Sequence, residues 1–521
     1  MEPRILLARL SGLFFALLFL STLNAYAQEA GDLLVTDWEY KPNTFINSVY
    51  VDDLNGDGVN ELIATTKDGV IYDLLKKKSG HTNWQYILKG DVKALKILDY
   101  DGDGKKEILA GTDNMGLSVR LLDWQGGIKG SSIEYDPSVY SLDASDIDGD
   151  GKNDIIIGAQ AKSVDIFSTS KDKILWSYAT NGPVYYVKGT DLNGDGKPVV
   201  VAASIWNDNE QDYAEVYAID SKGKNKWTYG VSGGIIGSAS HPVDVFDVNG
   251  DGKAEVLVGS KTHGLDVLSP GGALLWNYQT EKYVNVVYAY KDAGRTVILL
   301  GATPYVYALD GGGAIIWRYR VNTTVYALEA ADINSDVKPE VLVGAGNYLH
   351  VLSEAGKELS SLNYAGDVHG LATGDLNGDG GTEVVAGLGW SEARLDHNYQ
   401  FGNIVVYTVN KDYTATGTNP EKPLQTTTTT QTRVTNPGKK TTTSTLTEAD
   451  TVLTTETIET STTESIEPAK TNNGVTLAIL AGLGIGGLIL LIILAVIVVL
   501  VLKKKSGGKK PPAEPKPANT T

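Results

Sequence analysis

The feature that most constrains this chain is a short acidic stretch that recurs along it. Between Asp146 and Asp154 the sequence reads D-x-D-x-D-G-x-x-D and continues directly into the apolar run Ile155–Ile157. Side-chain oxygens at positions 1, 3, 5 and 9, with a backbone carbonyl at position 7, suit a hard cation such as Ca²⁺. The glycine at position 6 lets the chain turn sharply enough to bring these oxygens together.

An EF-hand loop begins in the same way, but it needs an acid at position 12 and a helix on each side. Here position 12 is Ile157, and the flanking residues are β-branched and apolar, which favours strands. The pattern therefore predicts a calcium-binding turn inside a β-hairpin.

The stretch occurs seven times, beginning at Asp53, Asp99, Asp146, Asp191, Asp247, Asp332 and Asp375. All but one of the intervals between successive starts lie between 43 and 56 residues, and the exception is 85. The long interval predicts an eighth unit whose turn has shortened, at Tyr288–Gly301. Eight units near 45 residues, each with about four short strands, predict an all-β fold, an eight-bladed β-propeller over residues 31–410.

A second repeat predicts how the ring closes. Val216–Trp227 and Val306–Trp317 each read as two strands joined by a glycine turn, with the tryptophan on the outer strand. Trp38 precedes the first acidic turn, so one outer strand comes before any blade has begun. Gly402–Val409 reads as a third strand with no tryptophan strand after it. We therefore expect Leu33–Tyr40 to complete the last blade and to remove the open sheet edges.

The acidic turns followed by apolar strands resemble the FG-GAP/VCBS repeats of integrin α-chain propellers. The Tyr/Val-rich strands with Ala-x-Asp-x-x-Gly…Trp turns resemble the repeats of eight-bladed quinoprotein propellers. Together the two resemblances cover residues 31–410. They imply several structural Ca²⁺ ions that rigidify hairpins on the face opposite the one that binds ligands.

The resemblance implies five complete ligand sets, in which position 7 contributes only its carbonyl. These sets are Asp53, Asn55, Asp57, Val59 and Glu61; Asp99, Asp101, Asp103, Lys105 and Glu107; Asp146, Asp148, Asp150, Lys152 and Asp154; Asp247, Asn249, Asp251, Lys253 and Glu255; and Asp375, Asn377, Asp379, Gly381 and Glu383.

Two turns depart from the pattern, and we expect weaker metal binding in both. In one of them, Val199 stands where the last acid should be. In the other, Val337 replaces the turn glycine at a position suited to positive φ. Their remaining ligands are Asp191, Asn193 and Asp195, and Asp332, Asn334, Asp336, Lys338 and Glu340.

The two ends of the chain predict export and a membrane anchor. Residues 1–27 read as a signal peptide, with Arg4 and Arg9 beside an apolar run and Ala25–Ala27 as the cleavage site. Residues 411–473 are rich in Thr, Ser, Glu and Pro and read as an extended stalk.

Residues 475–502 contain no charge and are long enough to span a bilayer as a single helix. The basic residues 503–521 then predict a cytoplasmic tail, with the propeller outside. Gly482 and Gly486 form a G-x-x-x-G pattern, through which the helix could pair into a homo-dimer. Cysteine is absent, and we expect a prokaryotic surface protein.

The net charge and the absence of common catalytic motifs narrow the classes of function that this chain could have. The chain has 45 Lys and Arg against 63 Asp and Glu, a net charge of −18, which argues against a nucleic-acid partner. It has six histidines and no H-E-x-x-H, G-x-S-x-G or phosphate-binding glycine loop. We expect a binding or adhesion module for a glycan or protein ligand. A quinoprotein-like enzyme and a cell-envelope assembly scaffold stay open as alternatives.

The expected ligand site lies away from the acidic turns. Trp206–Tyr213 in blade four and Trp390–Phe401 in blade eight read as long loops, on blades that face each other across the ring. Their aromatic residues would form opposed walls, unless the loops pack only on themselves. Inner-strand residues six positions before each acidic turn would surround the channel mouth, as a site or as a polar plug. The candidate ligand residues are Trp206, Tyr213, Trp390, Tyr399 and Phe401 in the walls, and Tyr185, His241, Tyr326 and His369 in the ring, which also includes Asn47, Lys93, Tyr140 and Asn285.

Overall fold

The computed structural model describes residues 32–75, 81–113, 118–129, 135, 138–236, 242–262, 264–394, 397–410 and 413, without the side chains of Leu75 and of residues 390–400. The signal peptide, stalk, membrane helix and basic tail expected from the sequence lie outside these residues. Within them, no helix is long and apolar enough to cross a bilayer.

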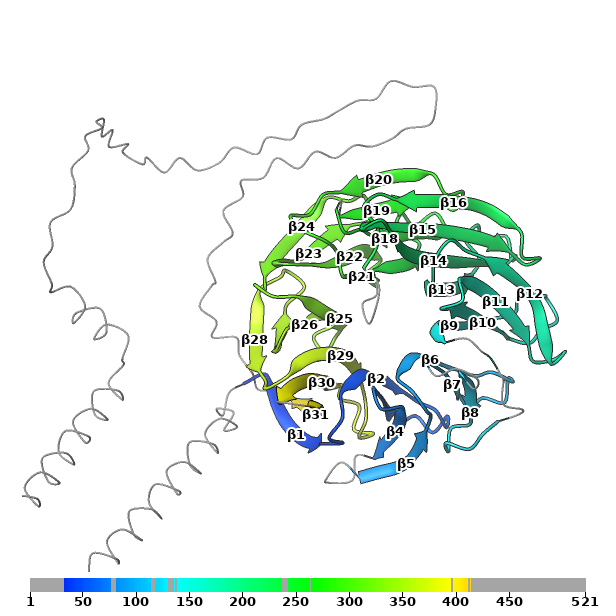
Figure 1. Ribbon diagram of the computed structural model, residues 1–521. Coiled ribbons are helices and arrows are strands. Elements are labelled where there is room, and N and C mark those ends of the chain that lie inside the picture. Colours follow the sequence, from blue (N-terminus) through cyan, green and yellow to red (C-terminus); the bar gives the residue numbers. More distant parts are fainter. Residues whose placement is uncertain are drawn as a thin grey trace, which may run out of the picture. The chain divides into compact units, whose positions relative to one another are not determined.

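The described residues form 31 strands in eight antiparallel sheets, which succeed one another around a ring (Figure 1). The eight-bladed propeller is therefore confirmed. Blade 1 contains β2 (Ile46–Asp52), β3 (Glu61–Thr66), β4 (Val70–Leu75) and β5 (His81–Ile87); blade 2 contains β6 (Val92–Leu98), β7 (Glu107–Thr112) and β8 (Val119–Leu122); blade 3 contains β9 (Val139–Ser145), β10 (Asp154–Ala159), β11 (Ser163–Ser168) and β12 (Lys173–Ala179); blade 4 contains β13 (Val184–Thr190), β14 (Val199–Asp208), β15 (Gln211–Asp220) and β16 (Asn225–Val231).

The second half of the ring is built in the same way. Blade 5 contains β17 (Val243–Phe246), β18 (Glu255–Gly259), β19 (Leu265–Leu268) and β20 (Leu274–Tyr278); blade 6 contains β21 (Val286–Asp292), β22 (Arg295–Ala302), β23 (Tyr305–Asp310) and β24 (Ile315–Arg320); blade 7 contains β25 (Val325–Ala331), β26 (Glu340–Ala345), β27 (Tyr348–Leu352) and β28 (Glu358–Asn363); blade 8 contains β29 (Asp367–Gly374), β30 (Glu383–Arg394), β31 (His397–Val409) and β1 (Leu34–Tyr40).

The N-terminal strand closes the ring as the sequence predicts. β1 pairs antiparallel with β31, from Leu34 opposite Val409 to Tyr40 opposite Ile404 (Figure 1). Leu34 and Trp38 are buried in this position. Because β31 gains a partner on its outer side, blade 8 has the same four strands as its neighbours.

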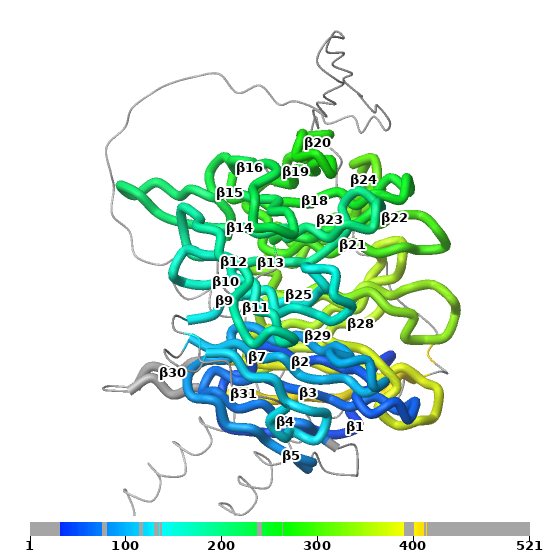
Figure 2. Tube along the Cα trace, turned by 90° about the vertical axis from the view of Figure 1, so that its right-hand side faces the viewer, coloured from blue at the N-terminus to red at the C-terminus, as the bar shows by residue number. Residues whose placement is uncertain are grey.

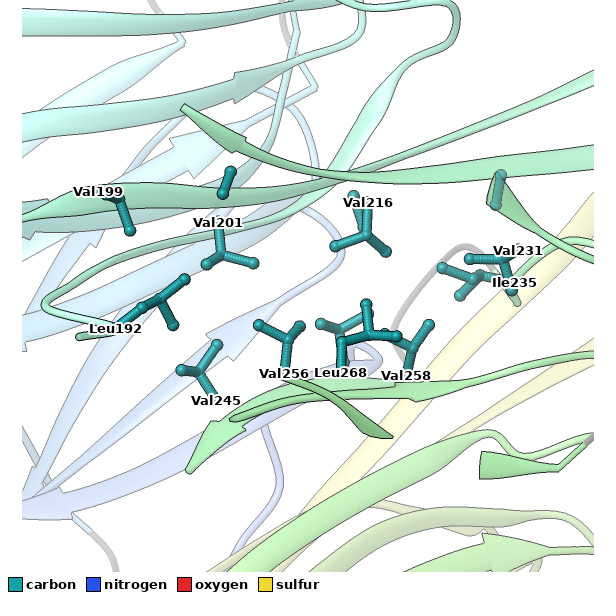
Figure 3. Packing of buried hydrophobic residues seen from close by; sticks show 14 residues of the cluster. Leu192, Val199, Val201, Val216, Val231, Ile235, Val245, Val256, Val258 and Leu268 are labelled. Atoms are coloured by element: carbon teal, nitrogen blue, oxygen red, sulfur yellow. The ribbon is translucent and has the colours of Figure 1, made fainter. Parts of the chain in front are cut away.

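The apolar core lies between successive blades. Second strands such as β10 are buried along their whole length, because a blade packs on each face. Figure 3 shows one such layer, where Val201 and Val216 of blade 4 face Val256 and Val258 of blade 5. Full burial of one such side chain contributes about 1.5–3 kcal/mol to folding.

At five junctions, a tryptophan of the outer strand joins one blade to the next. The Trp227 indole donates a hydrogen bond to the carbonyl of Pro270, over 2.9 Å, and its ring covers Gly272. A Cβ at Gly272 would lie 2.5 Å from that ring, and the residue has φ +80°, so only glycine suits the position. The repeated glycine and tryptophan are thus two halves of one inter-blade contact. The same pairing joins Trp84 to Gly126, Trp176 to Gly223, Trp276 to Gly313 and Trp317 to Gly356.

The first two strands of blade 6 are joined by the shortened turn that the sequence predicts. β21 and β22 pair as far as Asp292 opposite Arg295, with only Ala293 and Gly294 between them. Both turn residues have positive φ, 47° and 84°.

The two long loops expected in blades 4 and 8 are instead long hairpins, and the loop prediction is wrong. β14 and β15 stay paired as far as Asp208 opposite Gln211, and β30 and β31 as far as Arg394 opposite His397. In blade 4 a two-residue turn at Asn209 and Glu210, with φ 50° and 65°, lets pairing continue. This hairpin extends past its neighbours on one side of the ring (Figure 2). Alternation of antiparallel strands places it on the face opposite the acidic turns.

Candidate functional site

The first aspartate of each acidic turn organises the backbone of that turn. In blade 1, Asp53 accepts hydrogen bonds from the N–H groups of Gly56, at 2.8 Å, and Gly58, at 2.9 Å. Both glycines have positive φ, 78° and 87°. Glycine is therefore needed at position 4 as well as at position 6.

The last acid of the turn holds the loop to the strand. In blade 1, Glu61 accepts a hydrogen bond from the N–H of Leu54 and another from the Asn55 amide, both over 2.8 Å. Burial raises the pKa of Glu61, Glu255 and Glu340 to about 7. Ionising this carboxyl is therefore costly unless a cation lies nearby.

The side chains of these turns fit a cation that takes oxygen ligands. In blade 2, Asp99, Asp101 and Glu107 bring carboxylate oxygens within 4.8 Å of one another, and Asp146, Asp148 and Asp154 do the same in blade 3. Two oxygens at the usual distance of about 2.3–2.6 Å from one Ca²⁺ ion lie at most about 4.6–5.2 Å apart, so these separations suit a shared ion. The structure thus brings positions 1, 3 and 9 together. In blade 1 the third ligand of this kind would be the amide oxygen of Asn55.

Position 5 is not part of these trios. The carboxylate of Asp103 accepts a hydrogen bond from the N–H of Lys105 at 2.8 Å, and that of Asp150 accepts one from Lys152 at 3.0 Å. The fifth residue therefore shapes the turn with one oxygen, and in blade 3 its second oxygen accepts a hydrogen bond from the Ser170 hydroxyl.

Lys129 and Lys171 come from other connections and pair with carboxylates of the acidic turns, and sequence reasoning missed both. The Lys129 ammonium lies 2.7 Å from Asp101 and 2.6 Å from Glu107. The hydrogen bond from Lys129 holds the pKa of Asp101 below its usual range. Lys171 makes an ion pair with Asp148 in blade 3. Each lysine comes from the connection between the third and fourth strand positions of its blade, which shares a face with the acidic turns.

The two irregular turns keep part of the common geometry. In blade 4, Asp191 still accepts a hydrogen bond from Gly196 at 2.6 Å, but Val199 offers no carboxylate. In blade 7, Ser335 and Val337 have φ 65° and 73°, where the other turns have glycine. The backbone of blade 7 therefore adopts the common turn at the expense of strain at two residues.

Hydrogen bonds link neighbouring turns around this face of the ring. The N–H of Lys106 donates to the carbonyl of Leu54 over 2.8 Å, and the N–H of Asn60 donates to Asp375 over 3.0 Å. Blade 6 has no acidic turn, and there the Lys291 ammonium donates to the carbonyl of Asp247 over 2.9 Å. These bonds brace the turns of blades 1, 5 and 8 against the neighbouring blade.

A cavity of about 560 Å³ lies among the inner strands, and several side chains of the expected ring line it. Tyr140 and Tyr185 stack there with ring centroids 4.8 Å apart and planes 20° apart. Asn47 and Lys93 line the same cavity, and both contact Asp91 over 2.5 Å. The structure therefore brings four of the ring residues to one site.

The other ring residues lie elsewhere. The ring of His369 lies between those of Tyr326, at 4.5 Å, and Phe45, at 4.6 Å, with the planes tilted by 39° and 47°, in a separate aromatic group. Burial lowers the pKa of His369 to about 4, so its imidazole is neutral at physiological pH. Asn285 is buried and donates to the carbonyl of Val325, and His241 lies outside the described residues.

A second ring of inner-strand residues, three positions before each acidic turn, was not anticipated. Lys96 pairs with Asp143 at 2.9 Å, and Lys188 pairs with Asp244 at 3.4 Å, along the wall of the cavity. The constant offset of three residues is the signal that could have revealed it. Because each charge has a partner, the cavity wall is polar with little net charge.

Two of the residues expected in the walls contact each other. Trp206 and Tyr213 stack on each other, with centroids 5.6 Å apart and planes 13° apart. Their neighbour Ile205 lines the cavity, whereas these two rings do not. Phe401 is half-buried, and the side chains of Trp390 and Tyr399 lie outside the described part of the chain.

Known proteins resemble this chain in repeat and in fold. The FG-GAP repeat profile matches residues 138–185, and the FG-GAP-like repeat profile matches residues 191–258. No curated protein sequence matches the chain. The crystal structure of the computationally designed Ika8 protein has a TM-score of 0.52 at 14% identity, over 73% of this chain and 100% of that one. BamB from Moraxella catarrhalis has a TM-score of 0.47 at 16% identity, over 73% and 99%. The FG-GAP resemblance is thus confirmed, and the structural likeness concerns the fold alone.

Proposed function

We propose that this chain is a binding module of the cell surface, which recognises a glycan at the mouth of its central channel. In this proposal Ca²⁺ in the acidic turns braces the opposite face. The observation that carries the proposal is the cavity of about 560 Å³ with the stacked Tyr140 and Tyr185 on its wall.

The character of the cavity favours a sugar over a protein surface. Its volume lies within the roughly 300–1,000 Å³ of small-molecule sites. A stable protein interface instead buries roughly 1,200–2,000 Å² over a broad surface. Tyrosine faces offer apolar contact for a sugar ring, and the paired charges of Lys96 with Asp143 and Lys188 with Asp244 offer hydrogen bonds without net charge. A neutral, hydroxylated ring matches these features.

The test is a screen of glycans and proteins with the calcium-loaded, full-length protein, followed by variants. Tyr140→Ala and Tyr185→Ala should weaken binding of a glycan hit about tenfold, because each removes an aromatic contact. Tyr348→Ala is the matched control, since Tyr348 is 39% exposed on the third strand of blade 7. A screen that yields only protein ligands, or a glycan that binds both variants normally, would contradict the proposal.

The proposed location rests on residues 475–502, which have the length and apolar composition of a membrane span. The stalk at 411–473 would hold the channel mouth away from the bilayer. Protease treatment of intact cells should release a fragment that contains the propeller. Recovery of the untreated chain in the soluble fraction would argue against an anchor.

A further inference from the structure

The acidic turns fall into two classes according to the residue at position 3. In blades 1, 4, 5, 7 and 8 this residue is asparagine, and in all of these except blade 4, which has Val199 at position 9, its amide donates a hydrogen bond to the glutamate at position 9. Blades 2 and 3 have Asp101 and Asp148 instead, and an ionised carboxylate has no hydrogen to donate. The asparagine bonds are Asn55 to Glu61 at 2.8 Å, Asn249 to Glu255 at 3.0 Å, Asn334 to Glu340 at 2.9 Å and Asn377 to Glu383 at 2.6 Å.

In blade 2 a lysine makes the contact that asparagine makes elsewhere. The Lys129 ammonium donates to Glu107 at 2.6 Å and lies 2.7 Å from Asp101, so it joins positions 3 and 9. It is also 3.8 Å from Asp103. The Lys129 backbone is fixed by its own N–H, which donates to the carbonyl of Leu121 over 3.0 Å. The ammonium is therefore held among the carboxylates by local structure.

Blade 3 has an equivalent cation from the turn between β11 and β12. Lys171 contacts Asp148, again at position 3, and lies 4.0 Å from Asp150. The neighbouring Ser170 hydroxyl donates to Asp150 at 2.5 Å. In both blades a lysine thus pairs with the additional aspartate at position 3. The four carboxylates of the turn together with this lysine have the same net charge as the three carboxylates of an asparagine-class turn.

We propose that Lys129 and Lys171 are internal counter-ions, which hold these two turns closed without metal and compete with Ca²⁺ for their carboxylates. This inference rests on the proposed calcium binding. Ca²⁺ would require direct bonds of about 2.3–2.6 Å to the oxygens of Asp101 and Glu107, and these oxygens now accept from Lys129. The ammonium has to leave when the metal binds. The turns of blades 2 and 3 would therefore fill at higher Ca²⁺ concentrations than those of the asparagine class.

Lysine labelling of the full-length protein provides a site-specific test. With an amine-reactive reagent and mass spectrometry, Lys129 and Lys171 should be protected in chelator and should become several-fold more reactive as Ca²⁺ is added. Lys253 is the internal control, because it occupies position 7 of the blade 5 turn and contributes its carbonyl. Labelling of Lys129 and Lys171 that does not respond to Ca²⁺, while calorimetry detects Ca²⁺ binding, would overturn the counter-ions and leave the calcium proposal intact.

Variants test the competition independently. Lys129→Met should tighten one Ca²⁺ site about tenfold and should lower the melting temperature in chelator, whereas Lys253→Met should do neither. Weaker Ca²⁺ binding in Lys129→Met would mean that the lysine positions the carboxylates, which overturns the proposal. Asp101→Asn gives blade 2 an asparagine at position 3, so adding Lys129→Met to it should have little further effect in chelator. Equal effects of Lys129→Met in both backgrounds would also contradict the inference.

Discussion

Blade 6 and the seven blades with acidic turns are built on the same strands but joined differently. In blade 6, Asp292 and Arg295 form the last pair before a two-residue turn. In blade 5, Phe246 and Glu255 form the last pair, and eight residues lie between them. The hairpin therefore does not need the acidic turn. The positions of the blades are set by apolar packing and, at five junctions, by a tryptophan contact between neighbouring blades.

What the acidic turn adds is visible in blade 5. Val248, at position 2 of the turn, is only 3% exposed, and its N–H donates to Glu255 over 3.1 Å. Its carbonyl packs against Gly311 of blade 6, where a Cβ would lie 1.9 Å from the oxygen. The turn thus places an apolar side chain and a carbonyl between two blades. It buries Glu255 and leaves Asp247 partly exposed and Asp251 exposed.

Removal of Ca²⁺ should produce the largest difference in stability between the blades with acidic turns and blade 6. One bound Ca²⁺ adds about 2.7 kcal/mol to stability at a hundredfold excess over Kd, so seven sites together have a large effect. We expect chelator to lower the melting temperature of the full-length protein by on the order of 10 °C or more. Hydrogen exchange should accelerate at the acidic turns and leave β21 and β22 protected. An unchanged melting curve in excess chelator would refute the structural role of calcium.

Exchange of one turn for the other should have a smaller effect. Replacing Asp247–Ala254 with Ala-Gly gives blade 5 the connection of blade 6. We expect the protein to fold, to bind one Ca²⁺ fewer, and to lose about 1.5–3 kcal/mol in urea unfolding with chelator present, because Val248 no longer lies between the blades. Val248→Ala is the control that separates the side chain from the rest of the turn. If Val248→Ala folds and the exchanged protein does not, the acidic turn is required for the hairpin.

The smallest effect should come from blade 7, whose turn has the common shape without the common glycine. Val337 has φ 73° and is 88% exposed. We expect Val337→Gly to raise the free energy of unfolding by about 1 kcal/mol, because the strain of a β-branched residue at positive φ disappears. Val337→Ala keeps a Cβ and should recover less. Urea unfolding measures the free energy of unfolding of both variants. Equal gains for Val337→Gly and Val337→Ala would mean that the effect comes from the exposed valine side chain and not from backbone strain.

The fold could be predicted because its signals are periodic. The acidic turns set the number of blades, and the early Trp38 indicates which strand closes the ring. The composition of Trp206–Tyr213, which is rich in acids and amides, indicates a loop, whereas the structure has a long hairpin there. The pairing continues because Asn209 and Glu210 both adopt positive φ in the turn. Asparagine adopts this conformation more readily than glutamate does, so the sequence signals the turn only weakly.

The candidate site was predictable only in part. Positions 1, 3 and 9 could be assigned from one turn at a time. Lys129 lies 22 residues from Glu107, and its contact depends on how a different connection folds back. The pairing of Lys96 with Asp143 joins two blades, so it follows from the curvature of the ring and from no local pattern. Contacts between blades therefore could not be predicted from the sequence and became visible only in the structure.

The closure of blade 8 determines how the ring responds to tension. The chain continues from β31, which has β30 on one side and β1 on the other. The Tyr413 hydroxyl also donates to the carbonyl of Leu359 in blade 7, over 2.5 Å. A pull on the residues after Tyr413 must therefore first free this contact and then shear two ladders at once, whereas an edge strand would peel away one bond at a time. The ring thus takes up mechanical load at a strand held from both sides.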